Sequence, residues 1–225
     1  MIELRNVFKS YRYKGQNRQV LNNINLRIEK GEKVAVMGKN GSGKTTLLNL
    51  IAAVDTPDEG EYLFKGQNLP VNKPVLLNSV RRSSFGYIPQ ASCLIREKSG
   101  FYNISLPLFF RGYSKAEIKE KVDEAASLLN IIHLLDKRPD EMSSGECQKI
   151  AIARALISNP EVILADEMTN TLDEESKNTV LSLVKNSKEM TAVIVTHDKS
   201  VATTCDKILY LYEGAIQMNP YSYME

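Results

Sequence analysis

The sequence predicts an α/β fold built on a largely parallel sheet, and two observations support this. Three short segments are apolar throughout: residues 34–37, 162–165 and 193–195. Segments without polar alternation are typical of strands that helices cover on both faces, as in a parallel sheet. Each segment is followed by small or chemically active residues, in chain order Gly38, Asp166-Glu167 and Thr196-His197-Asp198. Because ligands of open α/β sheets bind beyond the carboxyl ends of strands, these positions also predict a site.

Two regions outside these segments have different patterns. Residues 2–13 and 20–28 alternate apolar and polar positions and predict strands of an N-terminal antiparallel β subdomain. Residues 92–158 carry helix signals instead, including the capping-box pattern of Ser114 and Glu117. We therefore expect a helical unit inserted between the strands of the sheet.

The full chain of 225 residues is expected to form one domain. Within it, residues 1–91 and 159–225 would form an α/β core that carries the β subdomain, and residues 92–158 the helical subdomain. Smaller elements are predicted as helices over 46–54, 100–111, 148–158 and 174–189 and as a C-terminal hairpin over 208–211 and 215–218.

Composition excludes several classes of protein. Hydrophobic residues make up 43% and charged residues 25%, as in globular chains. No stretch approaches the roughly 18 apolar residues of a spanning helix, and no signal peptide is visible, so we expect a cytosolic protein. The net charge of +2 is too small to predict a nucleic-acid partner. Three cysteines without a C-x-x-C pair predict reduced thiols and no zinc site.

The segment after the first apolar run matches the P-loop pattern. Its residues are Gly38, Lys39, Asn40, Gly41, Ser42, Gly43, Lys44 and Thr45, followed by Thr46. Glycines let backbone N–H groups approach phosphate oxygens, and the helix that follows adds its positive N-terminal end. Lys44 would contact the β- and γ-phosphates, and the Thr45 hydroxyl would bind Mg²⁺. The alternative is a tight strand-to-helix turn without a ligand.

Two adjacent carboxylates end the second apolar run. Asp166 is expected to hold Mg²⁺, and Glu167 to activate a water for in-line attack on phosphorus. Acidic residues also favour helix N-termini, so a purely structural role is the alternative.

With these residues, the chain resembles the ATP-binding subunits of ABC transporters from Tyr11 to His197. The run 142–146 is similar to the signature sequence of that family, and 149–156 continues it closely. The resemblance implies further roles at matching positions. Tyr11 would stack on adenine, Gln90 would be the Q-loop glutamine and a Mg²⁺ ligand, Asp173 would lie in the D-loop at the dimer contact, and His197 would contact the γ-phosphate.

The family resemblance also implies partners. Two copies would enclose ATP and Mg²⁺, so that Ser143, Gly145 and Glu146 of one copy face the ATP of the other. A separate membrane permease would be the second partner and would place the chain at the inner face of the membrane. The run 165–173 resembles the branch that serves lipoprotein release, macrolide efflux and peptide-antibiotic export.

Three positions depart from the family pattern. Ser144 replaces a glycine, Glu146 replaces a glutamine, and Met168 replaces a proline. Because Ser143 and Gly145 are kept, we expect function to survive, although the charge of Glu146 would weaken ATP-driven dimerisation.

Several residues have a simpler alternative role. Ser143 and Glu146 form a capping-box pattern, Asp173 is placed to cap the next helix, and Tyr13 rivals Tyr11 as the stacking residue. Aromatic residues over 101–113 would either fill a core or form the docking surface for the permease.

Three other functions stay open at this level. The first is a soluble ABC-type ATPase that acts on nucleic acid. The second is an ATPase that signals through a membrane partner without moving cargo. The third, a P-loop kinase or GTPase, would lack its guanine motif and leave the signature run unexplained.

Overall fold

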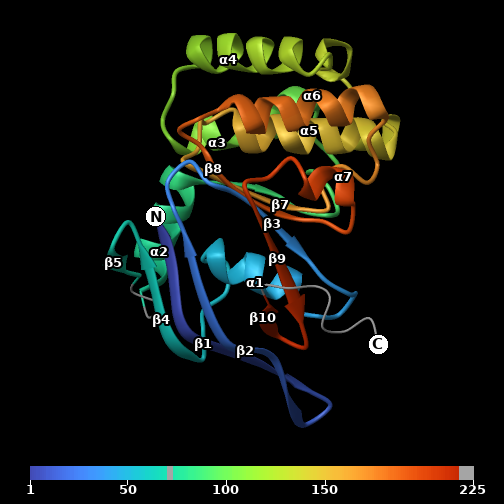
Figure 1. The fold of residues 1–225 in the computed structure, drawn as a ribbon. Coiled ribbons are helices and arrows are strands. Elements are labelled where there is room, and N and C mark those ends of the chain that lie inside the picture. The colour runs from blue at the N-terminus through green and yellow to red at the C-terminus, as the bar shows by residue number, and fades with distance from the viewer. Residues whose placement is uncertain (70–72, 218–225) are drawn as a thin grey trace. The chain divides into compact units, whose positions relative to one another are not determined.

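The computed structural model describes residues 1–69 and 73–217. The chain divides into two compact units, Met1–Arg81 with Thr191–Glu225 and Arg82–Met190. Each unit is described by itself below, with the element labels of Figure 1. The subdomain boundaries expected from the sequence stay a prediction.

The first unit contains a four-stranded antiparallel sheet with the order β2-β1-β4-β5. The strands are β1 (Ile2–Tyr13), β2 (Gln16–Ile28), β4 (Glu59–Phe64) and β5 (Gln67–Asn68). Leu4 of β1 lies opposite Leu26 of β2 and Tyr62 of β4, and all three side chains are buried. The antiparallel strands predicted at the N-terminus are confirmed. The sequence does not predict the pair β4 and β5, because glutamates at exposed positions of β4 leave too few apolar residues to show an alternating pattern.

The same unit contains the buried strands β3 (Lys33–Met37) and β8 (Thr191–Val195), which pair in parallel. On its other side β3 pairs in parallel with β9 (Lys207–Tyr212), and β9 forms a hairpin with β10 (Ala215–Gln217). Every residue of β3 and β8 is buried, as the continuous apolar runs predict. Met218, which the sequence predicts to belong to the hairpin, lies outside the described residues.

Two helices complete the first unit, α1 (Lys44–Ile51) and α7 (Lys199–Ala202). Helix α2 (Pro74–Ser84) runs across the boundary to the second unit. It was not predicted, because the segment carries arginines and serines and has no capping signal.

The second unit combines a parallel strand pair with helices. Strand β6 (Phe85–Ile88) pairs with β7 (Val162–Asp166), so that Ile88 lies beside Ala165. The helices are α3 (Gly100–Phe110), α4 (Lys115–Leu128), α5 (Ser144–Leu156) and α6 (Glu174–Asn186), with two 3₁₀ turns, Ile132–Leu134 and Pro139–Glu141. Helix α3 packs against both α4 and α5.

The capping box predicted for α4 is confirmed. The Ser114 hydroxyl accepts from the N–H of Glu117 at 3.3 Å, and the Glu117 carboxylate accepts from the N–H of Ser114 at 2.8 Å. The buried face of α4 presents Ile118, Val122 and Ala126 at helical spacing. Among the described residues, no helix has both the length and the apolar character needed to cross a membrane.

Candidate nucleotide site

The P-loop joins β3 to α1 in the first unit. Gly43 is the N-cap of α1 with a φ of 103°, and a Cβ there would lie 2.9 Å from the carbonyl oxygen of Val20. Only glycine meets both conditions without strain. The Lys44 Nζ donates to the carbonyl oxygens of Gly38 at 2.8 Å and Lys39 at 3.0 Å. The loop therefore wraps its own backbone around the ammonium, directly before the N-terminal end of α1.

The groups of this loop fit a polyanionic ligand. The Ser42 hydroxyl is buried, and its oxygen has no hydrogen-bond partner among the described residues. The first turn of α1 contains no acidic residue. The loop thus combines an ammonium, hydroxyls of Ser42, Thr45 and Thr46 and a helix N-terminus, all of which favour phosphate.

Tyr11 and His197 belong to the same unit as the P-loop. His197 follows β8, and its loop is held because the N–H of Thr196 donates to the carbonyl of Val36 at 3.1 Å. Because β8 and β3 are parallel neighbours, the exposed His197 and the P-loop leave the sheet at the same edge. Tyr11 on β1 is 39% exposed. The side chain of its rival Tyr13 lies outside what the structure describes.

The two acidic residues lie in the second unit at the end of β7. Asp166 is 4% exposed and Glu167 is 9% exposed. Glu167 has a φ of 50°, in the left-handed region that non-glycine residues seldom adopt. Helix α6 begins only at Glu174, so the carboxylates do not cap a helix, and that alternative is wrong. A buried acidic pair in an unusual backbone conformation is instead typical of functional sites.

Gln90 follows the strand next to β7. It is exposed, two residues beyond the end of β6, and β6 runs parallel to β7. Gln90, Asp166 and Glu167 therefore leave this strand pair at the same edge. Burial and then the charge of Asp166 raise the pKa of Tyr87 in β6 to about 12.

The signature residues form the N-terminus of α5. Ser143 is the N-cap, and its hydroxyl accepts from the N–H of Glu146 at 3.2 Å. In return the Glu146 carboxylate accepts from the N–H of Ser143 at 2.7 Å, which lowers the pKa of Glu146. The predicted capping box is confirmed, and the Glu146 carboxylate is turned back onto its own helix.

Gly145 packs closely against the segment that precedes α6. A Cβ at this position would lie 2.6 Å from the carbonyl oxygen of Thr171. The signature helix and the predicted D-loop therefore touch backbone to backbone within the second unit. Side chains larger than hydrogen would push the two segments apart.

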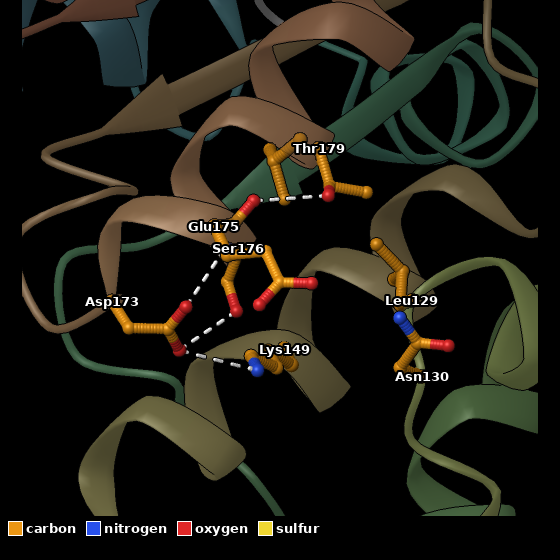
Figure 2. A pocket seen from close by; sticks show the side chains of 8 residues that line it. Leu129, Asn130, Lys149, Asp173, Glu175, Ser176 and Thr179 are labelled. Atoms are coloured by element: carbon orange, nitrogen blue, oxygen red, sulfur yellow. Dashed lines mark hydrogen bonds and ion pairs between the residues drawn. The ribbon is translucent and has the colours of Figure 1, made fainter.

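Asp173 lines a pocket between α5 and α6 (Figure 2), and the volume of this pocket is about 260 Å³. Its carboxylate accepts from the N–H and the hydroxyl of Ser176, each at 2.8 Å, and lies 3.5 Å from the Lys149 Nζ. The hydrogen bonds from Ser176 lower the pKa of Asp173 to about 2. The helix-capping role is confirmed, and the role at a dimer contact stays a prediction.

Two side chains that hold the predicted Q-loop carry no signal in the sequence. Arg154 of α5 donates to the carbonyls of Ser92 and Cys93, both at 2.8 Å, and Gln148 donates to the carbonyl of Pro89 at 3.4 Å. These contacts join residues about 60 positions apart through main-chain oxygens. No local pattern reports such a contact, so only the folded structure could reveal them.

Comparison with known proteins identifies the family. The model of the family described as "ABC transporter" matches residues 21–170. The chain belongs to the ABC transporter family. The ABC ATPase cassette fold and the binding of ATP, expected from the resemblance, are confirmed.

Relatives of this ABC cassette include single subunits and larger proteins. The macrolide export ATP-binding/permease protein MacB of Pasteurella multocida (strain Pm70) is 36% identical over 96% of this chain. The uncharacterized ABC transporter ATP-binding protein YknY of Bacillus subtilis (strain 168) is 35% identical, and the alignment covers 96% of this chain and 95% of YknY. The chain spans about a third of MacB, with 34% of that protein covered.

Solved structures agree with the fold. The dimeric structure of MJ0796, described as a bacterial ABC transporter cassette, superimposes with a TM-score of 0.92 at 35% identity and covers 96% of this chain and 97% of its own. A second dimeric MJ0796 structure, a post-hydrolysis state bound to ADP and Pi, has a TM-score of 0.93 at 34% identity and the same coverage.

Proposed function

We propose that this ABC cassette hydrolyses ATP as a homodimer and drives a separate membrane permease of the export branch. The P-loop carries the proposal, because its backbone encloses the Lys44 ammonium beside a buried hydroxyl and a helix N-terminus. The dimeric form of MJ0796 and the export name of MacB support the dimer and the branch. The chain would lie at the cytoplasmic face of the membrane through its permease.

The nucleotide would be held by residues of the first unit. Phosphate oxygens would accept hydrogen bonds from the residues of the P-loop and the start of α1, which are Gly38, Lys39, Asn40, Gly41, Ser42, Gly43, Lys44, Thr45 and Thr46. The Lys44 ammonium exchanges its carbonyl partners for the β- and γ-phosphates, which neutralises part of their charge. The Tyr11 ring would stack on the adenine.

Mg²⁺ fits the donor set proposed for it. The hydroxyl of Thr45, the amide oxygen of Gln90 and the carboxylate of Asp166 are hard oxygen ligands, and oxygen is what this ion selects. Bound there with ATP, it would neutralise negative charge on the phosphates.

Glu167 and His197 would act on the reacting atoms. The Glu167 carboxylate orients a water and accepts its proton as the water oxygen bonds to the γ-phosphorus. The bond between that phosphorus and the bridging oxygen breaks, and ADP keeps the electron pair. His197 would donate a hydrogen bond to the γ-phosphate and hold it in line. General-base roles of this kind contribute about 10²–10⁴-fold to rate.

A facing copy would complete the site. The N-terminus of its α5, with Ser143 and Gly145, would bind the γ-phosphate as a capped helix end binds an anion. Glu146 would lie beside the same phosphate, and Asp173 at the dimer contact. Only a nucleotide that carries a γ-phosphate would bridge both copies, so hydrolysis would release them.

The permease would dock on exposed aromatic side chains of the second unit. Phe109 is 44% and Phe110 is 66% exposed at the end of α3. A pocket of about 600 Å³ beside them is lined by Phe101, Phe109 and Ile118 among others. An apolar cavity rimmed by charged side chains is typical of a surface that receives a partner's helix.

The substitution Glu167→Gln tests the proposal. It keeps the size of the side chain but removes the base, so steady ATP turnover should fall by at least about 100-fold while ATP binding persists. The variant should accumulate an ATP-bound dimer, measured by light scattering after gel filtration with ATP. Turnover close to that of the wild type would refute the role of Glu167.

A further inference from the structure

The hydroxyl of Tyr11 is held within the first unit. It donates to the Asp55 carboxylate at 2.6 Å. Asp55 follows the C-terminal end of α1, the helix that begins at the P-loop. This hydrogen bond therefore ties the ring to the segment that follows that helix.

Lys9 supports this arrangement from the same strand. Lys9 and Tyr11 are two residues apart on β1, and both side chains contact the Asp55 carboxylate. The Lys9 Nζ lies 2.9 Å from the Asp55 carboxylate and 5.3 Å from the centre of the Tyr11 ring, over its face. Lys9 itself is buried, with further contacts to the carbonyl of Thr56 at 2.7 Å and to Asp58 at 3.2 Å.

The ring is consequently covered on one face by an ammonium, while Tyr11 as a whole stays 39% exposed. A cation over one face draws electron density from the ring, which favours an electron-rich purine on the other face. Because the hydroxyl and the covering cation are both anchored, the ring does not have to be ordered when the base arrives. Ordering a free side chain at a binding site costs affinity.

We propose that Lys9, Tyr11 and Asp55 form a base clamp, which holds the stacking ring at a set distance from the P-loop. The clamp rests on the proposed function, in which Tyr11 stacks on adenine. Asp55 and Lys9 are positioning residues in it, because they act on the nucleotide only through the ring. The clamp makes the affinity for the adenosine part of ATP depend on a hydroxyl that does not touch the base.

Titration calorimetry of the full chain with ATP and with inorganic tripolyphosphate tests the clamp. Tyr11→Phe keeps the ring and removes the anchored hydroxyl, so the Kd for ATP should rise by about three- to tenfold, the range expected for one hydrogen bond. The Kd for tripolyphosphate, which has no base, should stay unchanged. Asp55→Ala should give the same pattern, and the double variant should be no weaker than either single one.

Tyr62→Phe is the matched control. The buried Tyr62 hydroxyl donates to the carbonyl of Ile51 at 2.6 Å, at the other end of α1 from the P-loop. Its removal should lower stability and leave both affinities unchanged. Tyr11→Phe that binds ATP like the wild type, or that weakens both ligands equally, overturns the clamp. Tyr11→Ala that binds ATP like the wild type overturns instead the proposal that Tyr11 stacks on adenine.

Discussion

The Lys44 ammonium is hydrogen-bonded to the backbone of its own loop. Its Nζ donates to the carbonyl oxygens of Gly38 and Lys39, and the residue is only 8% exposed. A buried ammonium needs such partners, because an unpaired charge in the interior is costly. The loop conformation and the lysine therefore stabilise each other.

Replacing Lys44 by alanine should cost nucleotide affinity for this reason. Lys44→Ala removes the charge-assisted hydrogen bonds to phosphate and leaves two loop carbonyls without their donor. We expect the Kd for ATP to rise by roughly 10- to 100-fold in equilibrium titrations. Unchanged ATP binding in a folded variant would contradict the assignment of the loop. Lys33→Ala is a useful control, since Lys33 is also a buried lysine that donates to a loop carbonyl, that of Gly31.

Asp173 should make stability depend on pH. Hydrogen bonds from Ser176 lower its pKa to about 2 from a usual value of 3.8, so the folded state favours the carboxylate. The contribution is complete above about pH 4 and is lost as the pH falls toward 2. Asp173→Asn keeps a capping side chain that does not titrate. Urea unfolding from pH 5 to pH 2.5 should show a smaller loss of stability for Asp173→Asn than for the wild type, and equal losses would exclude this role.

At the scale of elements, α5 joins the motifs of the second unit. Its N-terminus carries Ser143 and Gly145, and its later turns hold the segment around Gln90 through Gln148 and Arg154. One helix therefore joins the signature run to the segment around Gln90.

Arg154→Ala tests this connection. Without Arg154 the carbonyls of Ser92 and Cys93 lose their donors, so we expect a loss of about 1–3 kcal/mol of stability. ATP turnover should fall more than ATP affinity, because the segment of Gln90 lies in the second unit and the P-loop in the first.

Arg111→Ala is the control, since Arg111 holds carbonyls of Arg82, Ser83 and Ser158 in the same unit but away from Gln90. Equal kinetic losses in both variants would mean that Arg154 acts through stability alone.

The elements differ in how well the sequence predicts them. The sequence predicts the strands β3, β7 and β8, because a strand that is buried on both faces is a continuous run of apolar residues. The capping boxes of α4 and α5 were predicted because they are local. The strand β4 and the contact of Tyr11 with Asp55 were missed. The exposed glutamates of β4 interrupt its apolar alternation, and Tyr11 and Asp55 lie 44 residues apart in the sequence.

At the scale of the whole molecule, the proposed dimer should respond to Glu146. Glutamine also completes a capping box, so Glu146→Gln keeps the structure of α5 and removes one negative charge beside the phosphate of the facing copy. In the Glu167→Gln background, sedimentation with ATP should show a dimer dissociation constant lowered by a few fold. Glu117→Gln changes the matching capping box of α4 and should leave the dimer unaffected. A weaker dimer in Glu146→Gln would contradict the repulsion.

The carbonyl of Thr171 leaves no room for even a methyl group at residue 145. The N-terminus of α5 and the segment that joins β7 to α6 are thus in direct backbone contact. In the proposed dimer, a displacement of this helix tip by a second copy would therefore press directly on the peptides that follow Glu167.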